Sequence, residues 1–113
     1  MKKFKYTNGW PVKRDWINHY KGPSGSIYVI RHGDTKYYKI GKSTRPEKRF
    51  SNLQIGNPIE LALVYHRNVI NYEEIEDYLH RVHWRNRVRG EWFCLRVKQV
   101  ELIIYYLELC AAR

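Results

Sequence analysis

Two short runs of β-branched and aromatic residues, joined by a turn sequence, constrain the fold of this chain more than any other feature. The first run is SIYVI at residues 26–30, and the second is YYKIG at residues 37–41. Between them lies HGDT at residues 32–35, in which Gly and Asp favour a tight turn. Because β-branched and aromatic side chains favour the pleated backbone of a strand, we expect an antiparallel hairpin here.

Helical signals follow this hairpin. TRPE at residues 44–47 has the pattern of a capping box with Pro in the first turn. It predicts a helix to about Gln54, which GNP at residues 56–58 would stop. Asn71 predicts the cap of a second helix, and the spacing of apolar residues predicts a third helix from about Val97 to the end of the chain.

One further strand is predicted between these helices, from ELALVYHR at residues 60–67, whereas residues 85–90 break the pattern. The order is β-β-α-β-α-α, and we expect an α+β fold with a small central three-stranded antiparallel sheet flanked by helices. Residues 26–113 would form this domain. Residues 1–25 show no sustained periodicity and end in GPSG, so they would form a separate N-terminal arm.

Charge is unevenly distributed along the chain. The net charge is +10, and residues 1–25 carry six basic side chains and one acidic one, so half of the excess lies in the arm. Small basic, aromatic-rich proteins suit nucleic acid, so we expect DNA as the partner, with RNA as the alternative. The arm offers Lys13, Arg14 and Lys21 as contacts, and it either lies along a groove of the nucleic acid or caps the domain.

The composition argues against several other classes. No apolar run approaches the roughly 20 residues that a membrane span needs, and the last helix has no basic polar face for a membrane surface. Polar residues follow the initial MKK where a signal peptide needs apolar ones, and two cysteines are too few for a disulfide scaffold. We therefore expect a cytoplasmic protein without a membrane partner, in which Cys94 and Cys110 are small core residues.

Alternation along the two hairpin strands places candidate residues on one face. Tyr28 and Ile30 share one side of the first strand, and Lys39 and Gly41 share one side of the second. Tyr28 and Lys39 can then point in the same direction, where a cation lowers the pKa of a phenol and favours a phenolate that accepts a proton. The alternative is an exposed Tyr–Lys pair on a solvated face.

Basic side chains recur on the first predicted helix. Arg45 and Arg49 lie one turn apart and can face the same way, and Lys48 is next to Arg49. Arginine forks match the oxygens of a phosphate group. These residues are therefore candidate phosphate contacts, and a plain solvated helix face is the alternative.

Glu76, His80 and His83 lie along one stripe of the second predicted helix. Because no C-x-x-C or H-E-x-x-H companion is present, we expect a catalytic or phosphate-contacting His80 rather than a zinc site. Glu91 is the single carboxylate of a basic segment, and it is either an ion-pair partner or an anchor for a divalent cation. The basic residues before it, which are further candidate nucleic-acid contacts, are Arg85, Arg87 and Arg89.

Several segments, in order along the chain, resemble the GIY-YIG nuclease superfamily. SIY at residues 26–28 and KIG at residues 39–41 resemble its two half-motifs, and GEWF at residues 90–93 resembles the segment with its metal-binding glutamate. Lys42 and Arg49 resemble its lysine and its catalytic arginine. The phrases YKIG, LQIGNP and RGEWF resemble a phage-type branch that is often labelled a DNA-binding domain. The likeness extends from about residue 26 to residue 104.

This resemblance implies a metal-dependent DNA endonuclease that leaves 5′-phosphate and 3′-hydroxyl ends. Tyr28 would be the general base, with Lys39 as the cation that it needs near neutral pH. Glu91 would hold one Mg²⁺ or Mn²⁺, which would stabilise the departing 3′ oxygen. Arg49 would neutralise charge on the scissile phosphate, and Lys42 would orient the water or the phosphate.

Three positions depart from the family pattern. Ser26 replaces the first glycine, and Lys39 replaces the tyrosine of the second half-motif, although some nuclease members resemble this chain in carrying lysine there. Leu53 stands where the family has a polar residue, a role that His80 would fill. The departures favour the alternative interpretation, which is a non-catalytic DNA- or RNA-binding module on the same scaffold.

A single centre of this kind cuts one strand at a time. A double-strand break would therefore need a homodimer or two successive nicks. Because the basic arm is the one further recognition element that the sequence offers, we expect limited sequence specificity or a partner protein that supplies it. Binding should depend strongly on salt, since basic side chains displace counterions from the phosphates.

Overall fold

The computed structural model describes residues 5–7, 10–12 and 22–111. The strands in these ranges are β1 (Lys5–Thr7), β2 (Trp10–Val12), β3 (Ser24–His32), β4 (Tyr37–Ser43), β5 (Leu61–Ile70), β6 (Arg87–Arg89) and β7 (Trp92–Cys94). The helices are α2 (Pro46–Ile55), α3 (Tyr72–Val82), α4 (Val97–Leu109) and a 3₁₀ turn, η1 (Trp84–Asn86). None of the described helices is long and apolar enough to cross a membrane.

Five of the described strands form one antiparallel sheet in the spatial order β5-β3-β4-β7-β6, and β1 pairs with β2 separately. The predicted α+β class is confirmed, but the expected three-stranded sheet is wrong. The missed strands, β6 and β7, form a hairpin whose turn contains Gly90 at φ +54°. All of β6 is exposed and two of its three residues are Arg, so this edge strand lacks apolar alternation.

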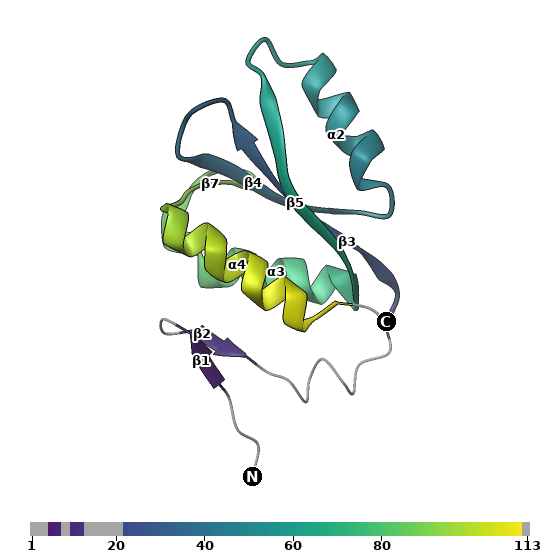
Figure 1. Ribbon diagram of the computed structural model, residues 1–113, viewed down its shortest axis with the longest axis vertical. Coiled ribbons are helices and arrows are strands. Elements are labelled where there is room, and N and C mark those ends of the chain that lie inside the picture. Colours follow the sequence, from purple (N-terminus) through teal and green to yellow (C-terminus); the bar gives the residue numbers. More distant parts are fainter. Residues whose placement is uncertain (1–4, 8–9, 13–21, 112–113) are drawn as a thin grey trace.

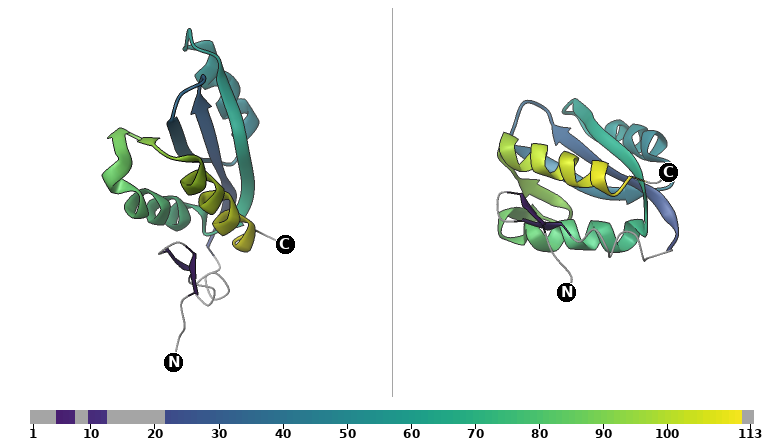
Figure 2. Two further views of the ribbon diagram at one scale, coloured as in Figure 1. Left: turned by 60° about the vertical axis from the view of Figure 1, so that its left-hand side comes forward. Right: turned by 60° about the horizontal axis from the view of Figure 1, so that its bottom comes forward.

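Helices cover both faces of the sheet. Figure 1 shows α2 on one side and α3 with α4 on the other, and the turned views in Figure 2 agree. Alternate residues of β3 point to opposite faces, as the hairpin pattern predicted, and both faces are buried, so they enter two different cores. The core beneath α3 and α4 takes Ile27 and Val29, whereas Tyr28 and Ile30 pack with side chains of α2.

The starts of two helices differ in detail from the prediction. The first helix begins at Pro46 after Arg45, and no side chain caps it, so the expected capping box at residues 44–47 is wrong. Instead, the backbone N–H of Arg45 donates to the Ser43 hydroxyl at 2.9 Å. Asn71 is the N-cap of α3, as predicted, but it has left-handed backbone angles and makes no side-chain cap. Its backbone N–H donates to the Pro23 carbonyl, which ties the start of β3 to this helix.

The two cysteines have different environments. Cys110 is buried in the core beneath α3 and α4, as expected. Cys94 is exposed, so its assignment to the core is wrong. Alternation along β7 explains the difference, because it turns the fully buried Phe93 and its neighbour Cys94 to opposite sides of the sheet.

The pairing of Tyr28 with Gly41 leads to a prediction about stability. A Cβ atom at position 41 would lie 2.3 Å from both Cζ and Oη of Tyr28, which is well below the van der Waals distance between heavy atoms. We expect Gly41→Ala to lower the free energy of unfolding by about 1–3 kcal/mol, measured by urea denaturation. Gly56→Ala is the matched control, since a Cβ there meets nothing within 4 Å. Equal stability of the two variants would contradict this account of the packing.

Candidate active site

The candidate residues lie near the part of β4 where one edge pairs with no other strand among the described residues. β7 pairs with β4 only over residues 37–39, and the next N–H, that of Ile40, donates to the Glu91 carbonyl at 3.1 Å. In the described part of the chain, residues 41–43 of β4 then have β3 on one side and no strand on the other. Because β7 is only three residues long, side chains from neighbouring elements can reach this edge.

Tyr28 reaches the edge across Gly41. Its side chain is 1% exposed and occupies the space that a Cβ of residue 41 would need. Burial raises the pKa of this phenol above its ordinary value of about 10, and the charge of Glu91 raises it further. A hydrogen bond and the charge of Arg49, an exposed residue of α2, act in the opposite direction. The phenol is therefore protonated at neutral pH, and Arg49 is the cation that favours its ionisation.

Lys39 has a different partner from the one predicted. It shares the Tyr28 face of the sheet, as expected, because its cross-strand partner is Ile30. Its ammonium group, however, donates to Glu91 Oε1 at 2.9 Å. The expectation that Lys39 lowers the pKa of Tyr28 is wrong, since that pKa is raised and the opposing cation is Arg49. Glu91 is thus an ion-pair partner of Lys39, and its side chain is still 40% exposed.

A second ion pair lies on the other face of β4. Lys42 is opposite Ile27 in the register, and its Nζ lies 3.3 Å from Oε1 of Glu76 on α3. The Glu76 side chain is only 7% exposed, and its Oε2 is buried with no hydrogen-bond partner among the described residues. Glu76 therefore keeps one carboxylate oxygen that no described group of the protein satisfies.

The charges at this edge influence one another. Burial raises the pKa of Glu76, and the nearby charge of Glu91 raises it further, whereas His80 and Lys42 lower it. Burial alone would lower the pKa of Lys42, but the pairing with Glu76 and more distant carboxylates raise it overall. Two carboxylates from different elements are thus close enough to repel each other across the edge of β4.

Glu76 is a functional candidate that was not predicted from the sequence, where it was considered only as part of a zinc site. The sequence did contain a signal, because Glu76 flanks the apolar stripe of α3 that begins at Ile75, and it is buried like Ile75. Carboxylates are almost never fully buried unless they are paired or serve a site. A carboxylate buried beside such a stripe therefore needs either a paired cation or a function.

His80, which the sequence predicts as a catalytic or phosphate-contacting residue, is bonded to the backbone of β4. Its Nε2 lies 2.7 Å from the carbonyl oxygen of Ile40, which can only accept, so Nε2 carries a hydrogen. Ile40 therefore donates to the β6–β7 turn and accepts from α3. His83 is buried, and its Nδ1 lies 3.0 Å from the Leu79 carbonyl. Among the described residues no group of three His, Cys, Asp or Glu lies close enough together to hold a metal ion.

The remaining candidate contacts form two exposed groups beside this edge. One group lies at the start of α2 and the other on η1 and β6, close to Glu91 in sequence. Lys13, Arg14 and Lys21 of the predicted arm lie outside the described residues. The exposed residues are Arg45 and Lys48 in the first group and Arg85, Arg87 and Arg89 in the second.

Comparison with known proteins gives one match. Residues 25–107 match the family model of the T5orf172 domain, which covers most of the chain. Neither the curated proteins nor the solved structures contain a match.

The buried carboxylate leads to a prediction about stability and pH. In a metal-chelating buffer at pH 8, we expect Glu76→Gln to be more stable than the wild type by on the order of 1 kcal/mol, because burial disfavours the charged form of this carboxylate more than its pairing with Lys42 favours it. The raised pKa means that above pH 4.5 the folded wild type binds more protons than the unfolded chain. Its free energy of unfolding therefore falls as pH rises through the folded pKa, and the two proteins should converge in acid.

Urea denaturation at several pH values between 4 and 8 measures this difference. Glu101→Gln is the control, since Glu101 is an exposed carboxylate on α4 and its substitution should change little. A Glu76→Gln protein less stable than the wild type at pH 8 would mean that attraction to Lys42 exceeds the cost of burial.

Proposed function

Because this chain belongs to the T5orf172 domain family, a phage-associated group related to endonucleases, we propose that it is a divalent-cation-dependent DNA endonuclease of the GIY-YIG type. It hydrolyses phosphodiester bonds and leaves 5′-phosphate and 3′-hydroxyl ends. The observation that carries the proposal is the convergence of two carboxylates, a phenol and a guanidinium at one edge of β4. A simple nucleic-acid-binding surface has no need of carboxylates beside phosphates.

The two carboxylates fit a hard divalent cation. Carboxylate oxygens are preferred ligands of Mg²⁺ and Mn²⁺, and Glu76 has a buried oxygen without a partner among the described residues. A cation between Glu76 and Glu91 would relieve the repulsion that raises the pKa of Glu76. Once bound, it would supply stabilisation of the charge on the departing 3′ oxygen. We therefore assign the cation to Glu76 together with Glu91.

The other side chains would position the phosphate and move the proton. Tyr28 Oη accepts a proton from the attacking water, and Arg49 both favours the phenolate and neutralises the phosphate. Lys42 keeps Glu76 ionised by pairing with it and presents its ammonium near the same edge. Lys39 holds the carboxylate of Glu91 in place from within the sheet.

One observation favours a second candidate, a DNA- or RNA-binding module without catalysis. The Glu91 carboxylate already has a cation in this structure, since the buried Lys39 ammonium lies 2.9 Å from it. A carboxylate neutralised in this way can have a purely structural role in the sheet. For the nuclease, Lys39 must give up or share this contact when the divalent cation binds.

Cleavage of supercoiled plasmid by the purified protein tests the proposal. We expect nicking in Mg²⁺ or Mn²⁺ and none in EDTA. Tyr28→Phe should lose about 10²- to 10⁴-fold in rate, because it removes the proton acceptor and keeps the ring. Glu76→Gln and Glu91→Gln should also lose cleavage, and Mg²⁺ should raise the Tm of the wild type but not of Glu76→Gln.

Tyr105→Phe and Glu101→Gln are matched controls, because both residues are exposed on α4, and their nicking rates should equal that of the wild type. A wild type that binds DNA but cuts neither plasmid, single-stranded nor branched DNA would instead support the binding module.

The raised pKa of Tyr28 predicts how the rate depends on pH. Below pH 10 the fraction of phenolate rises about tenfold with each pH unit, so kcat/KM for nicking should rise steeply between pH 7 and pH 9. The residual activity of Tyr28→Phe should lack this rise. Arg49→Ala should move it to higher pH, since Arg49 lowers the pKa of the phenol. A wild-type rate that is flat over this range would rule out Tyr28 as the base.

A further inference from the structure

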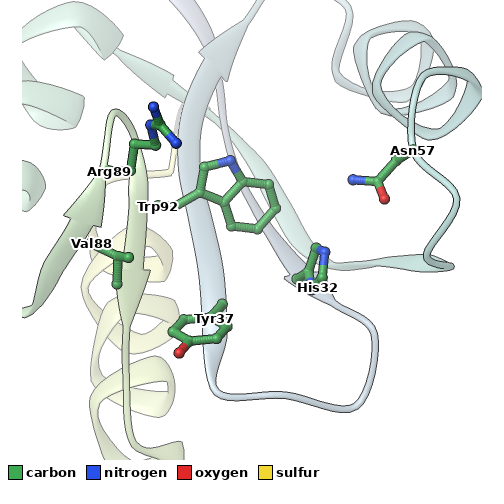
Figure 3. Close-up of a pocket in the computed structure, with 6 residues that line it drawn as sticks. All are labelled: His32, Tyr37, Asn57, Val88, Arg89 and Trp92. Atoms are coloured by element: carbon green, nitrogen blue, oxygen red, sulfur yellow. The ribbon is translucent and has the colours of Figure 1, made fainter.

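α2 leaves part of the Tyr28 face of the sheet uncovered. It packs on Tyr28 and Ile30, whereas His32, the next residue of β3 on that face, lines an open pocket of about 310 Å³. Figure 3 shows this pocket between the loop that follows α2 and the β6–β7 hairpin, with the Trp92 ring at its centre. The lining residues are His32, Tyr37, Asn57, Val88, Arg89 and Trp92.

The walls of the pocket are largely aromatic. The His32 ring meets the Trp92 ring edge-on, with 5.8 Å between centroids and 90° between planes. Tyr37 is 44% exposed, so one ring face is open to an incoming group. Aromatic side chains of this kind stack on nucleobases without regard to sequence, because every base has a π face.

Polar groups of the pocket suit the edge of a base. Asn57 Oδ1 accepts from the Ile59 N–H at 2.9 Å, which leaves the amide nitrogen as a donor, and Figure 3 shows that nitrogen on the side of Trp92. His32 Nδ1 is buried and has no hydrogen-bond partner among the described residues. The guanidinium of Arg89 adds positive charge at the rim, where a phosphate could lie.

The pocket adjoins the candidate active site, because Trp92 of the pocket contacts residues of that site. Trp92 follows Glu91 directly, and the Lys39 ammonium lies 2.9 Å from the Glu91 carboxylate and 5.9 Å from the centre of the Trp92 ring. Along β3, His32 is four residues beyond Tyr28 on the same face, a distance of about 13 Å. A strand whose phosphate lies at Tyr28 can therefore place a neighbouring base in the pocket.

We propose that this pocket takes one unpaired nucleobase of the nucleic-acid strand bound at the active site. The inference rests on the proposed function and specifies its substrate class, which is DNA with an unpaired nucleotide beside the cleavage point. A base within a regular duplex is stacked on both sides and cannot enter. The volume lies at the lower end of the 300–1,000 Å³ that is typical of small-molecule sites, which fits a single base better than a larger ligand.

Binding to a duplex with one bulged nucleotide tests the proposal, because the bulge fixes the register. In EDTA, fluorescence anisotropy should give a Kd for the bulged thymine duplex about 5- to 100-fold below that for the same duplex with an abasic bulge. A perfect duplex should bind like the abasic one. An RNA duplex with a bulged uracil, measured in parallel, shows which nucleic acid the pocket prefers.

A thermodynamic cycle links this preference to the pocket. Trp92→Ala should raise the Kd of the bulged duplex by the same factor as removal of the base does and leave the Kd of the abasic duplex unchanged. Because Trp92 also packs against the core beneath α2, Tyr37→Ala is a second variant on an exposed wall and should reduce the preference too. Tyr105→Ala, an exposed aromatic on α4, is the control and should retain it.

Binding in EDTA separates this proposal from the nuclease activity. A base-dependent preference without cleavage in Mg²⁺ would support the pocket and reject the enzyme. Cleavage without any preference for the bulged base would support the enzyme and overturn the pocket proposal. Equal Kd values for bulged, abasic and perfect duplexes would overturn the pocket proposal.

Discussion

The position of the Tyr28 ring over Gly41 is the contact on which the rest of the site depends. The two residues are cross-strand partners, and the ring fills the volume of the missing side chain. A larger residue at position 41 would displace the phenol from this place. The same glycine thus secures the sheet register, the packing of α2 and the place where the phenol oxygen reaches the sheet edge.

The two lysines of β4 lie on opposite faces of the sheet. Lys39 and Lys42 are three positions apart, so alternation directs one towards Glu91 and the other towards Glu76. Each carboxylate therefore has its own lysine, yet they are close enough for Glu91 to raise the pKa of Glu76. The two ion pairs leave Oε2 of Glu76 without a hydrogen-bond partner among the described residues, and the proposed divalent cation would bind to this oxygen.

Local sequence patterns predicted those features of the structure that depend on residues close together in the sequence. Period-two alternation placed Tyr28 and Lys39 on one face, and the Pro46 and Asn71 signals located two helix starts to within a few residues. The β6–β7 hairpin could not be seen, because its exposed, arginine-rich edge has no apolar alternation. Equally, the partner of Lys39 lies 52 residues away in sequence, and only the tertiary pairing of β4 with β7 brings Glu91 to it.

The end of α2 determines how much of the Tyr28 face is open. GNP at residues 56–58 stops the helix after Ile55, and the side-chain amide of Gln54 then bonds the Asn57 and Ile59 carbonyls and so orders the loop. Asn57 of this loop and His32 of β3 line the same pocket. The same stop signal that shortens α2 therefore leaves an aromatic pocket beside a buried phenol. In the proposed enzyme, a single sheet face combines a core, a reactive group and a recognition surface.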